Sequence, residues 1–311
     1  MSIGQEDNLL KIYKKKDKYE YFSKGILSSS LIAIGMDMTT SYEIASKVEQ
    51  KVSSIVEKIN KKQLIKFITS EIEKIDDRFA ERYKAHEGEE KYKPIVILLA
   101  GVPGIGKSTL ASLLSQRLEI SNIIWTDMIR EILRQTITPK LVPELHCSSY
   151  EAYKHLKSQL NPVLRQSIVG YEEQSRLVVV GIEAAIQSAL FSRENTIIEG
   201  VHLAPNILKP SVLQNPHVIL ILLYLKDEKE HLLRFQSRET KEVFRKAQKY
   251  IDEFKEIRSI QDYLYEVSIK AKVTVIDTYN NDEALNYLID TIWERIISLE
   301  RKMIKKKIIK K

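Results

Sequence analysis

The chain has almost no cysteine and no long apolar segment, and both absences exclude classes of protein. Cys147 is the single cysteine in 311 residues, which excludes an internal disulfide and a cysteine-based metal cluster. The longest run without charge, 210–225, includes proline, glutamine and asparagine, whereas a membrane-spanning helix needs about 18 or more apolar residues. The first residues show no signal-peptide pattern. We therefore expect a cytoplasmic protein without a membrane span.

The composition is that of a globular protein, with its net charge at one end. Apolar residues make up 43% and charged residues 29%, which excludes a disordered or collagen-like chain. Basic residues number 49 and acidic residues 42, and seven of the basic ones lie in 301–311. The rest of the chain is therefore formally neutral. We interpret the tail as a solvated extension of the last helix, with binding to nucleic acid or anionic lipid as the alternative.

The pattern changes near residue 93, which predicts two domains. The elements expected before it are a hairpin at 8–22, a helix from Ser23 to Gly35, a helix opened by Thr40 and Glu43 as a capping box, and a helix at 63–79. The polar stretch 81–93 is typical of a linker. We predict one domain over 1–92, a second over 93–300, and a tail over 301–311.

The second domain alternates apolar runs of strand length with helical segments. Strands are expected at 95–99, 122–125, 196–198, 218–225 and 273–276. Helices are expected at 107–118, 128–135, 171–191 and 282–299. Continuous apolar runs are typical of strands that are buried on both faces. The alternation therefore favours an α/β fold with a doubly wound parallel sheet of about five strands.

Residues 101–109, GVPGIGKST, match the phosphate-binding pattern G-x-x-x-x-G-K-[ST] between a predicted strand and a predicted helix. Such a loop turns backbone N–H groups toward phosphate oxygens, and the following helix directs its positive end at them. Lys107 is expected to reach the outer phosphates, and Ser108 to hold Mg²⁺. The predicted nucleotide-binding residues are Gly101, Gly104, Ile105, Gly106, Lys107, Ser108 and Thr109.

Polar residues follow two of the predicted strands, where ligands bind in parallel α/β sheets. Asp127 can accept the proton of an acceptor hydroxyl, and Arg130 can hold a substrate phosphate or carboxylate. Glu199 stands where P-loop proteins place a metal-holding acid, and His202 can contact the acceptor. The alternatives are a helix cap for Asp127, a plain charge at a strand end for Glu199, and a packing histidine for His202.

Two further segments carry candidate binding residues. Arg234, Arg238 and Arg245 lie in the charged segment 227–250, where a lid can bring arginines to a transferring phosphoryl group. A solvated helix is the alternative. In the segment 145–150, His146 and Ser148 can bind an anionic substrate, although a plain turn explains these residues equally well.

Taken together, these residues resemble archaeal 2-phosphoglycerate kinases over about residues 8–300. The matching motifs are YFSKGIL (21–27), GVPGIGKST (101–109), TDMIR (126–130), LHCSSYEAY (145–153), GIEAAI (181–186) and IIEGVHLAP (197–205). The resemblance implies a small α-rich ATP-cone-like regulatory domain, where ATP acts as a regulator, before a P-loop kinase domain with strand order 2-3-1-4-5. It also implies ATP and Mg²⁺ as cofactors and the 3-hydroxyl of 2-phosphoglycerate as the phosphoryl acceptor.

The leading hypothesis is therefore a 2-phosphoglycerate kinase with Lys107, Asp127, Arg130, Glu199 and Arg238 as catalytic residues. Mg²⁺ is assigned to Ser108 and Glu199, and the phosphorylated acid to Asp127, Arg130, His146, Ser148, His202 and Arg234. A nucleotide or RNA kinase is the second hypothesis, since TDMIR also suits a nucleotide phosphate. A non-catalytic ATP-sensing regulator is the third.

Overall fold

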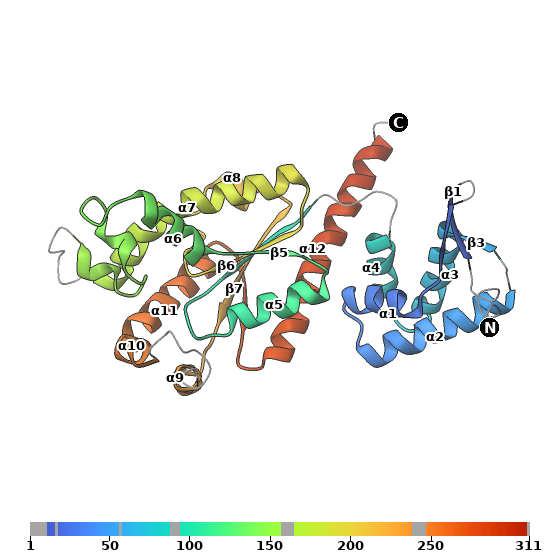
Figure 1. Cartoon of the computed structure of the whole chain (residues 1–311), viewed down its shortest axis with the longest axis horizontal. Coiled ribbons are helices and arrows are strands. Elements are labelled where there is room, and N and C mark those ends of the chain that lie inside the picture. The colour runs from blue at the N-terminus through green and yellow to red at the C-terminus, as the bar shows by residue number, and fades with distance from the viewer. Residues whose placement is uncertain are drawn as a thin grey trace, which may run out of the picture. The chain divides into compact units, whose positions relative to one another are not determined.

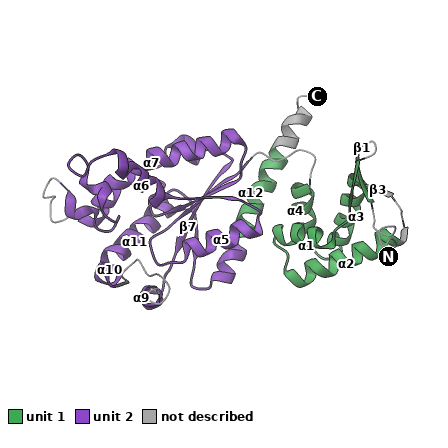
Figure 2. Cartoon of the chain, in the orientation of Figure 1, with its two compact units in different colours: residues 1–92, 289–311 green, residues 93–288 purple. Residues whose placement is uncertain are grey.

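The chain folds into two compact units (Figure 1; Figure 2). The computed structural model describes residues 11–15, 18–55, 58–87, 94–156, 165–237 and 247–309. The terminal unit combines Met1–Tyr92 with Ile289–Lys311, and the α/β unit is Lys93–Leu288. The first boundary between the units lies between Tyr92 and Lys93. The second falls before the expected residue 300, because residues from 289 onward pack in the terminal unit.

The terminal unit contains a small sheet and, among its described residues, helices that lie between the second and third strands or after the third strand in sequence. The strands are β1 (Lys11–Lys15), β2 (Lys18–Tyr21) and β3 (Lys58–Asn60), in the order β2-β1-β3. β1 and β2 form the expected antiparallel hairpin, whereas β3 pairs with β1 in parallel and is too short to stand out in the sequence. The helices are α1 (Lys24–Ala33), α2 (Met38–Ile55), α3 (Lys61–Glu73) and α4 (Asp77–Glu87).

Local hydrogen bonds explain where these helices differ from the prediction. The capping box at Thr40 is wrong, because α2 already begins at Met38 and the Asp37 carboxylate accepts the Thr40 amide at 2.9 Å. The single helix expected at 63–79 is two helices. Asp76 lies at the break, where its carboxylate accepts the backbone amide of Arg78 at 2.8 Å and thereby opens α4.

The last helix, α12 (Asn281–Ile309), completes the core of the terminal unit. The Trp293 side chain is 2% exposed, and its indole N–H donates to the Ala33 carbonyl at 2.9 Å. Arg82 is also buried and pairs with Asp290 at 2.8 Å. These contacts give the physical reason for the shifted boundary. The helix continues through the tail as far as Ile309, as the sequence indicates.

We predict that Trp293→Ala destabilises the terminal unit by about 3–5 kcal/mol, because the change leaves a cavity and an unpaired carbonyl. The measurement is urea unfolding followed by a probe in that unit. Phe191→Ala, which removes an aromatic ring that is 91% exposed, is the matched control and is expected to change little. Equal losses of stability in the two variants would contradict the prediction.

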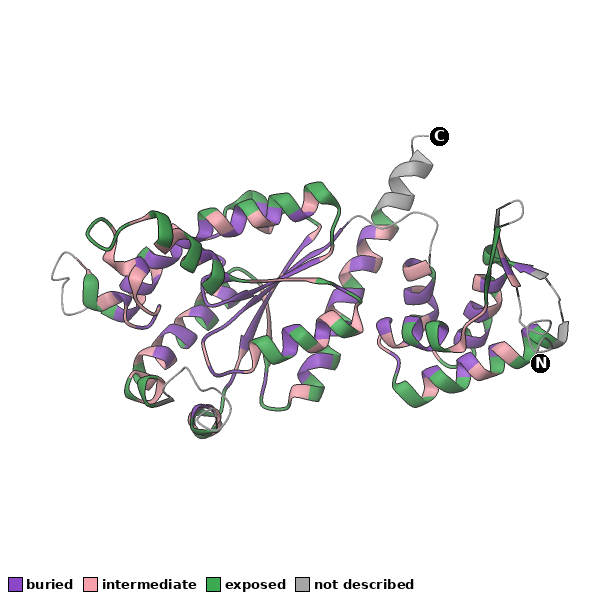
Figure 3. Ribbon diagram, in the orientation of Figure 1, coloured by how far each residue is buried: buried purple, intermediate pink, exposed green. Residues whose placement is uncertain are grey.

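The α/β unit is built on a five-stranded sheet that is parallel throughout. Its strands are β4 (Val96–Ala100), β5 (Asn122–Trp125), β6 (Thr196–Gly200), β7 (Val218–Tyr224) and β8 (Thr274–Asp277). The order β5-β6-β4-β7-β8 is 2-3-1-4-5 in the numbering of this sheet, which confirms the prediction. β4 and β6 are buried along their whole length (Figure 3).

Helices cover both faces of this sheet (Figure 1). The helical elements are α5 (Lys107–Arg117), α6 (Thr126–Thr136), η2 (Pro143–His146), η3 (Ala152–His155), α7 (Gln166–Ser192), α8 (Pro210–Leu213), α9 (Glu228–Gln236), α10 (Ala247–Asp252) and α11 (Phe254–Lys270). The crossover from β4 to β5 runs along the sheet in one direction, and those from β5 to β6 and from β7 to β8 run in the other. Because right-handed crossovers in opposite directions place their helices on opposite faces, α5 lies across the sheet from α7 and α11. α7 is long and apolar enough to cross a membrane, but its buried residues pack in this unit, as in a core helix.

Candidate active site

The phosphate loop connects β4 to α5, and its glycines set its shape. Gly104 and Gly106 have φ values of 88° and 92°, which glycine adopts without strain. A Cβ on Gly104 would lie 2.6 Å from the Phe235 ring. Gly106 is the N-cap of α5, so the unpaired amides of the first helical turn lie at the end of the loop. The loop therefore has the form of an anion cradle.

Lys107, Ser108 and Glu199 meet beside this loop. The Ser108 hydroxyl donates to Glu199 Oε1 at 2.5 Å, and Lys107 Nζ lies 4.0 Å from Glu199 Oε2. Lys107 also donates to the Val102 carbonyl at 2.9 Å. Glu199 is 4% exposed, so these partners and not water stabilise its buried carboxylate. A hydroxyl and a carboxylate are the hard oxygen ligands that Mg²⁺ prefers, and Mg²⁺ keeps most of its remaining ligands as water and phosphate.

The register of the sheet places the residues after β5 next to this group. Trp125 at the end of β5 pairs with Glu199 in β6. Asp127 follows in the first turn of α6, and its side chain is 58% exposed. The N-cap of α6 is Trp125, so the structure does not support a capping role for Asp127. Asp127 thus lies at the phosphate edge of the sheet with an accessible carboxylate.

Arg130 lies one turn further along α6, where the loop from η2 holds its guanidinium. Its Nη1 donates to the carbonyls of Cys147 at 2.6 Å and Leu145 at 3.2 Å. Its Nε lies 3.5 Å from Asp127 Oδ1. These contacts fix the guanidinium and the carboxylate relative to each other. The Arg130 side chain keeps only 14% of its surface exposed, so its charge is weakly screened by solvent.

The side chain of His146 and the backbone of Ser148, two residues predicted to bind substrate, take part in hydrogen bonds within this segment. His146 donates from Nε2 to the Ile137 carbonyl at 2.8 Å, and the Ser148 carbonyl accepts the Glu151 amide at 2.9 Å. Both residues are half-buried. Burial raises the pKa of the Cys147 thiol to about 11, so the cysteine stays protonated and donates to the Glu144 carbonyl. This segment therefore serves first as a structured loop that supports Arg130.

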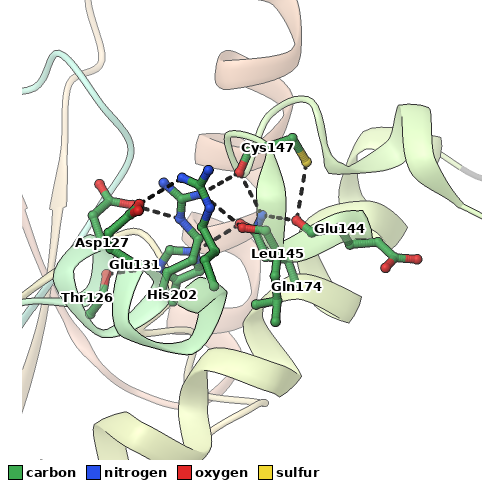
Figure 4. A network of polar contacts seen from close by, with 10 residues as sticks. Thr126, Asp127, Glu131, Glu144, Leu145, Cys147, Gln174 and His202 are labelled. Atoms are coloured by element: carbon green, nitrogen blue, oxygen red, sulfur yellow. Dashed lines mark hydrogen bonds and ion pairs between the residues drawn. The ribbon is translucent and has the colours of Figure 1, made fainter. Parts of the chain in front are cut away.

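His202 is not placed to touch a ligand, which corrects its assignment to substrate binding. It has no exposed surface, and its ring nitrogens meet Thr126 Oγ1 at 2.9 Å and Gln174 Oε1 at 3.0 Å (Figure 4). Burial lowers its pKa to about 4, so the ring is neutral. The packing alternative fits this position. Gln174, which the sequence reading missed, is a fully buried amide on the inward face of α7.

Arg234 is placed at the nucleotide side of the site and not at the acceptor side. Its guanidinium donates to the Ile105 carbonyl at 3.2 Å in the phosphate loop and to the Thr278 carbonyl at 2.8 Å after β8. Its Nε donates to Glu230 Oε1 at 2.8 Å. The assignment of Arg234 to the acid substrate is therefore not supported by its position. Arg238 and Arg245 lie outside the described residues.

A cleft of about 920 Å³ lies next to this arginine, between the start of α9 and the turn after β8. Its lining includes Lys226, Leu232, Phe254 and Tyr279, the last of which is 61% exposed. Tyr279 also offers its carbonyl to Arg234 at 2.9 Å. The lining also includes Asp227, Glu228, Lys229 and Asp277, so three apolar or aromatic side chains share the cleft with five charged ones. Through the Tyr279 carbonyl the cleft adjoins Arg234, which in turn donates to the Ile105 carbonyl of the phosphate loop.

A phosphate loop after the first strand of a parallel 2-3-1-4-5 sheet, with an acid at the end of the adjacent strand, defines a P-loop kinase. Solved structures with a related chain trace include a shikimate kinase from Bacteroides thetaiotaomicron, at 13% identity and a TM-score of 0.38 over 64% of this chain and 98% of that one. A score this low has no bearing on function.

Comparison with curated proteins gives the family. The chain is 36% identical over 300 residues to the 2-phosphoglycerate kinase of Methanopyrus kandleri, covering 95% of this chain and 91% of that one. It is 33% identical to that of Pyrococcus furiosus, with 94% and 97% covered, and 34% identical to that of Methanocaldococcus jannaschii, with 88% of each covered. No protein-family model matches the chain. The chain belongs to the archaeal 2-phosphoglycerate kinase family.

Proposed function

We propose that the chain transfers the γ-phosphoryl group of ATP to the 3-hydroxyl of 2-phosphoglycerate in the cytoplasm, which gives 2,3-bisphosphoglycerate and ADP. Membership of the family supports this reaction. The observation that supports it is the pairing of Trp125 with Glu199, because Asp127 follows two residues after Trp125 and Glu199 accepts the Ser108 hydroxyl next to the phosphate loop. Phosphoryl transfer requires that donor and acceptor be held together at one such edge.

The donor side is formed by the phosphate loop and its neighbours. Backbone amides of the loop hold the phosphates, and Lys107 neutralises charge on the outer ones. Ser108 and Glu199 fit Mg²⁺, which would spread the charge of the β- and γ-phosphate oxygens. We assign the base of ATP to the cleft beside Tyr279, whose carbonyl accepts the Arg234 guanidinium. Arg238 stays a prediction for the transferring group.

The acceptor side consists of Asp127 and Arg130. Asp127 accepts the proton of the 3-hydroxyl, whose oxygen attacks the γ-phosphorus while the bond to the β,γ-bridging oxygen breaks and ADP leaves with the electron pair. Arg130 binds an anionic group of the acid. Its Nη1 is fixed by two loop carbonyls and its Nε lies 3.5 Å from Asp127 Oδ1, so its positive charge is held beside the proposed base.

Regulation by ATP at the terminal unit is a further part of the proposal. The β1–β2 hairpin presents exposed rings of Tyr19 and Tyr21, whose centroids are 5.6 Å apart, and Lys11 Nζ lies 5.0 Å from the Tyr19 ring. A ring on which a base can stack, next to an ammonium group, suits a nucleotide. This surface supports a second nucleotide site, in line with the resemblance of 21–27 to an ATP cone.

The direct test offers the purified full-length protein ATP and Mg²⁺ with 2-phosphoglycerate, 3-phosphoglycerate, nucleoside monophosphates or RNA in separate reactions. We expect 2,3-bisphosphoglycerate from the 2-isomer alone, identified by mass spectrometry. Product on nucleotides or RNA, without any phosphorylated acid, would show that the acceptor is wrong while the kinase class holds. Intact ATP with every acceptor would favour a non-catalytic regulator.

A further inference from the structure

A buried chain of hydrogen bonds runs from the start of α6 to the loop that holds Arg130 (Figure 4). It joins Thr126, His202 and Gln174, which come from three distant parts of the sequence and have no exposed surface. The amide of Gln174 then donates from Nε2 to the carbonyls of Glu144 at 2.5 Å and Cys147 at 3.1 Å. The series of hydrogen bonds therefore ends at two backbone carbonyls, one in η2 and one directly after it.

The donors and acceptors at its end fix the direction of donation along this series of hydrogen bonds. Both final acceptors are carbonyls, so the Gln174 amide must present its N–H groups to them and its Oε1 to His202. His202 must then carry its proton on Nε2, and its Nδ1 accepts the hydroxyl of Thr126. Reversing any one member would leave two donors or two acceptors facing each other. A buried, fully paired network of this kind specifies one arrangement.

The same series of hydrogen bonds shares one atom with the contacts of Arg130. The carbonyl oxygen of Cys147 accepts both Gln174 Nε2 at 3.1 Å and Arg130 Nη1 at 2.6 Å. The guanidinium that faces Asp127 is thus held on a carbonyl whose position Gln174 fixes. Gln174 itself is buried behind the loop and reaches Arg130 only through this shared oxygen.

We infer that Gln174 is a positioning residue for the acceptor site, which orients Arg130 toward the anionic group of the acid through the carbonyl of Cys147. The inference rests on the proposed function for the role of Arg130 as an acceptor ligand. It assigns no contact with substrate to Gln174. Its consequence is that loss of the amide weakens the binding of the acid and leaves the phosphate loop and the binding of ATP intact.

The first experiment compares Gln174→Leu with Gln261→Leu. Gln261 is an equally buried glutamine on α11 whose amide bonds both backbone groups of Leu225, so its removal controls for lost stability. We expect Gln174→Leu to raise KM for 2-phosphoglycerate about tenfold, the effect of about 1.4 kcal/mol, with KM for ATP unchanged. Gln261→Leu is expected to leave KM for the acid unchanged. Equal changes in both variants, or a rise in KM for ATP alone, would overturn the inference.

A double-mutant cycle tests whether Gln174 acts through Arg130. Arg130→Ala is expected to raise KM for the acid more than Gln174→Leu does, and the double variant is expected to match Arg130→Ala alone. Effects that multiply would show that Gln174 acts independently, and the inference would fail while the proposed function stood. An unchanged KM in Arg130→Ala would instead remove the proposed role of Arg130.

The direction of donation along these hydrogen bonds can be measured without an activity assay. Nitrogen NMR of the imidazoles in the wild-type protein is expected to show His202 protonated on Nε2 and unprotonated on Nδ1, with its signal assigned by its loss in His202→Asn. A proton on Nδ1 would overturn the arrangement. If Gln174→Leu does not fold, Thr126→Val replaces it at the other end of the chain, and a change in KM for the acid is again expected. A wild-type protein that does not act on 2-phosphoglycerate would refute the proposed function, and the NMR result would still decide the chain of hydrogen bonds.

Discussion

Lys107→Ala is expected to lower kcat by about 10³-fold, the scale of losing a cation that stabilises a transferring phosphoryl group. The Lys107 ammonium is only 11% exposed and lies within 4.0 Å of Glu199, so little water is present to replace its charge. The glycine conformations set the shape of the loop, to which the lysine side chain adds one hydrogen bond, to the Val102 carbonyl. The measurement is steady-state formation of 2,3-bisphosphoglycerate at saturating acid.

Lys209→Ala is the matched control, because Lys209 is a lysine of the same unit that pairs with Glu183 away from the phosphate loop. We expect its kcat to stay within about twofold of the wild type. Thermal unfolding of both variants shows whether each keeps its fold. A Lys107→Ala enzyme that retains most of its turnover would rule out the donor-side assignment, whatever the acceptor is.

The parts of this fold that could be read from the sequence are those set by local patterns. The continuous apolar runs that became β4 and β7 and the glycine pattern of the phosphate loop need no knowledge of distant partners. The strand order could be expected only through the resemblance to a family. The boundary of the terminal unit could not be expected, because it depends on Trp293 meeting Ala33 across most of the chain.

At the acceptor side, too, local sequence patterns predict some residues, while the positions of others depend on contacts distant in sequence. Asp127 and Glu199 follow apolar runs, and the rule that ligands bind at the carboxyl ends of parallel strands was enough to bring them together. His202 was misassigned because its sequence position is equally compatible with a ligand contact and with burial. Gln174 carried one signal that was not used: it is a polar residue at a position where the spacing of buried residues on α7 requires an inward side chain.

Asp127→Asn is expected to lower kcat by about 10²–10⁴-fold, the range for losing a general base, while the affinity for ATP changes little. Asparagine keeps the size of the side chain and its place in the first turn of α6, but it cannot take the proton of the acceptor hydroxyl. Turnover is measured with both substrates saturating, and ATP affinity by calorimetry with the variant and the wild type.

Glu131→Gln on the same helix is the matched control, because the Glu131 side chain is half exposed and pairs with Arg134. It removes one negative charge one turn from Asp127 and is expected to leave kcat nearly unchanged, since exposed ion pairs contribute little. The two variants together separate a general loss of negative charge near α6 from the loss of a base. If Asp127→Asn weakens ATP binding as much as it slows turnover, Asp127 acts on the donor side, and the proton of the hydroxyl must go to another group, for which Glu199 is the nearest candidate in the sheet register.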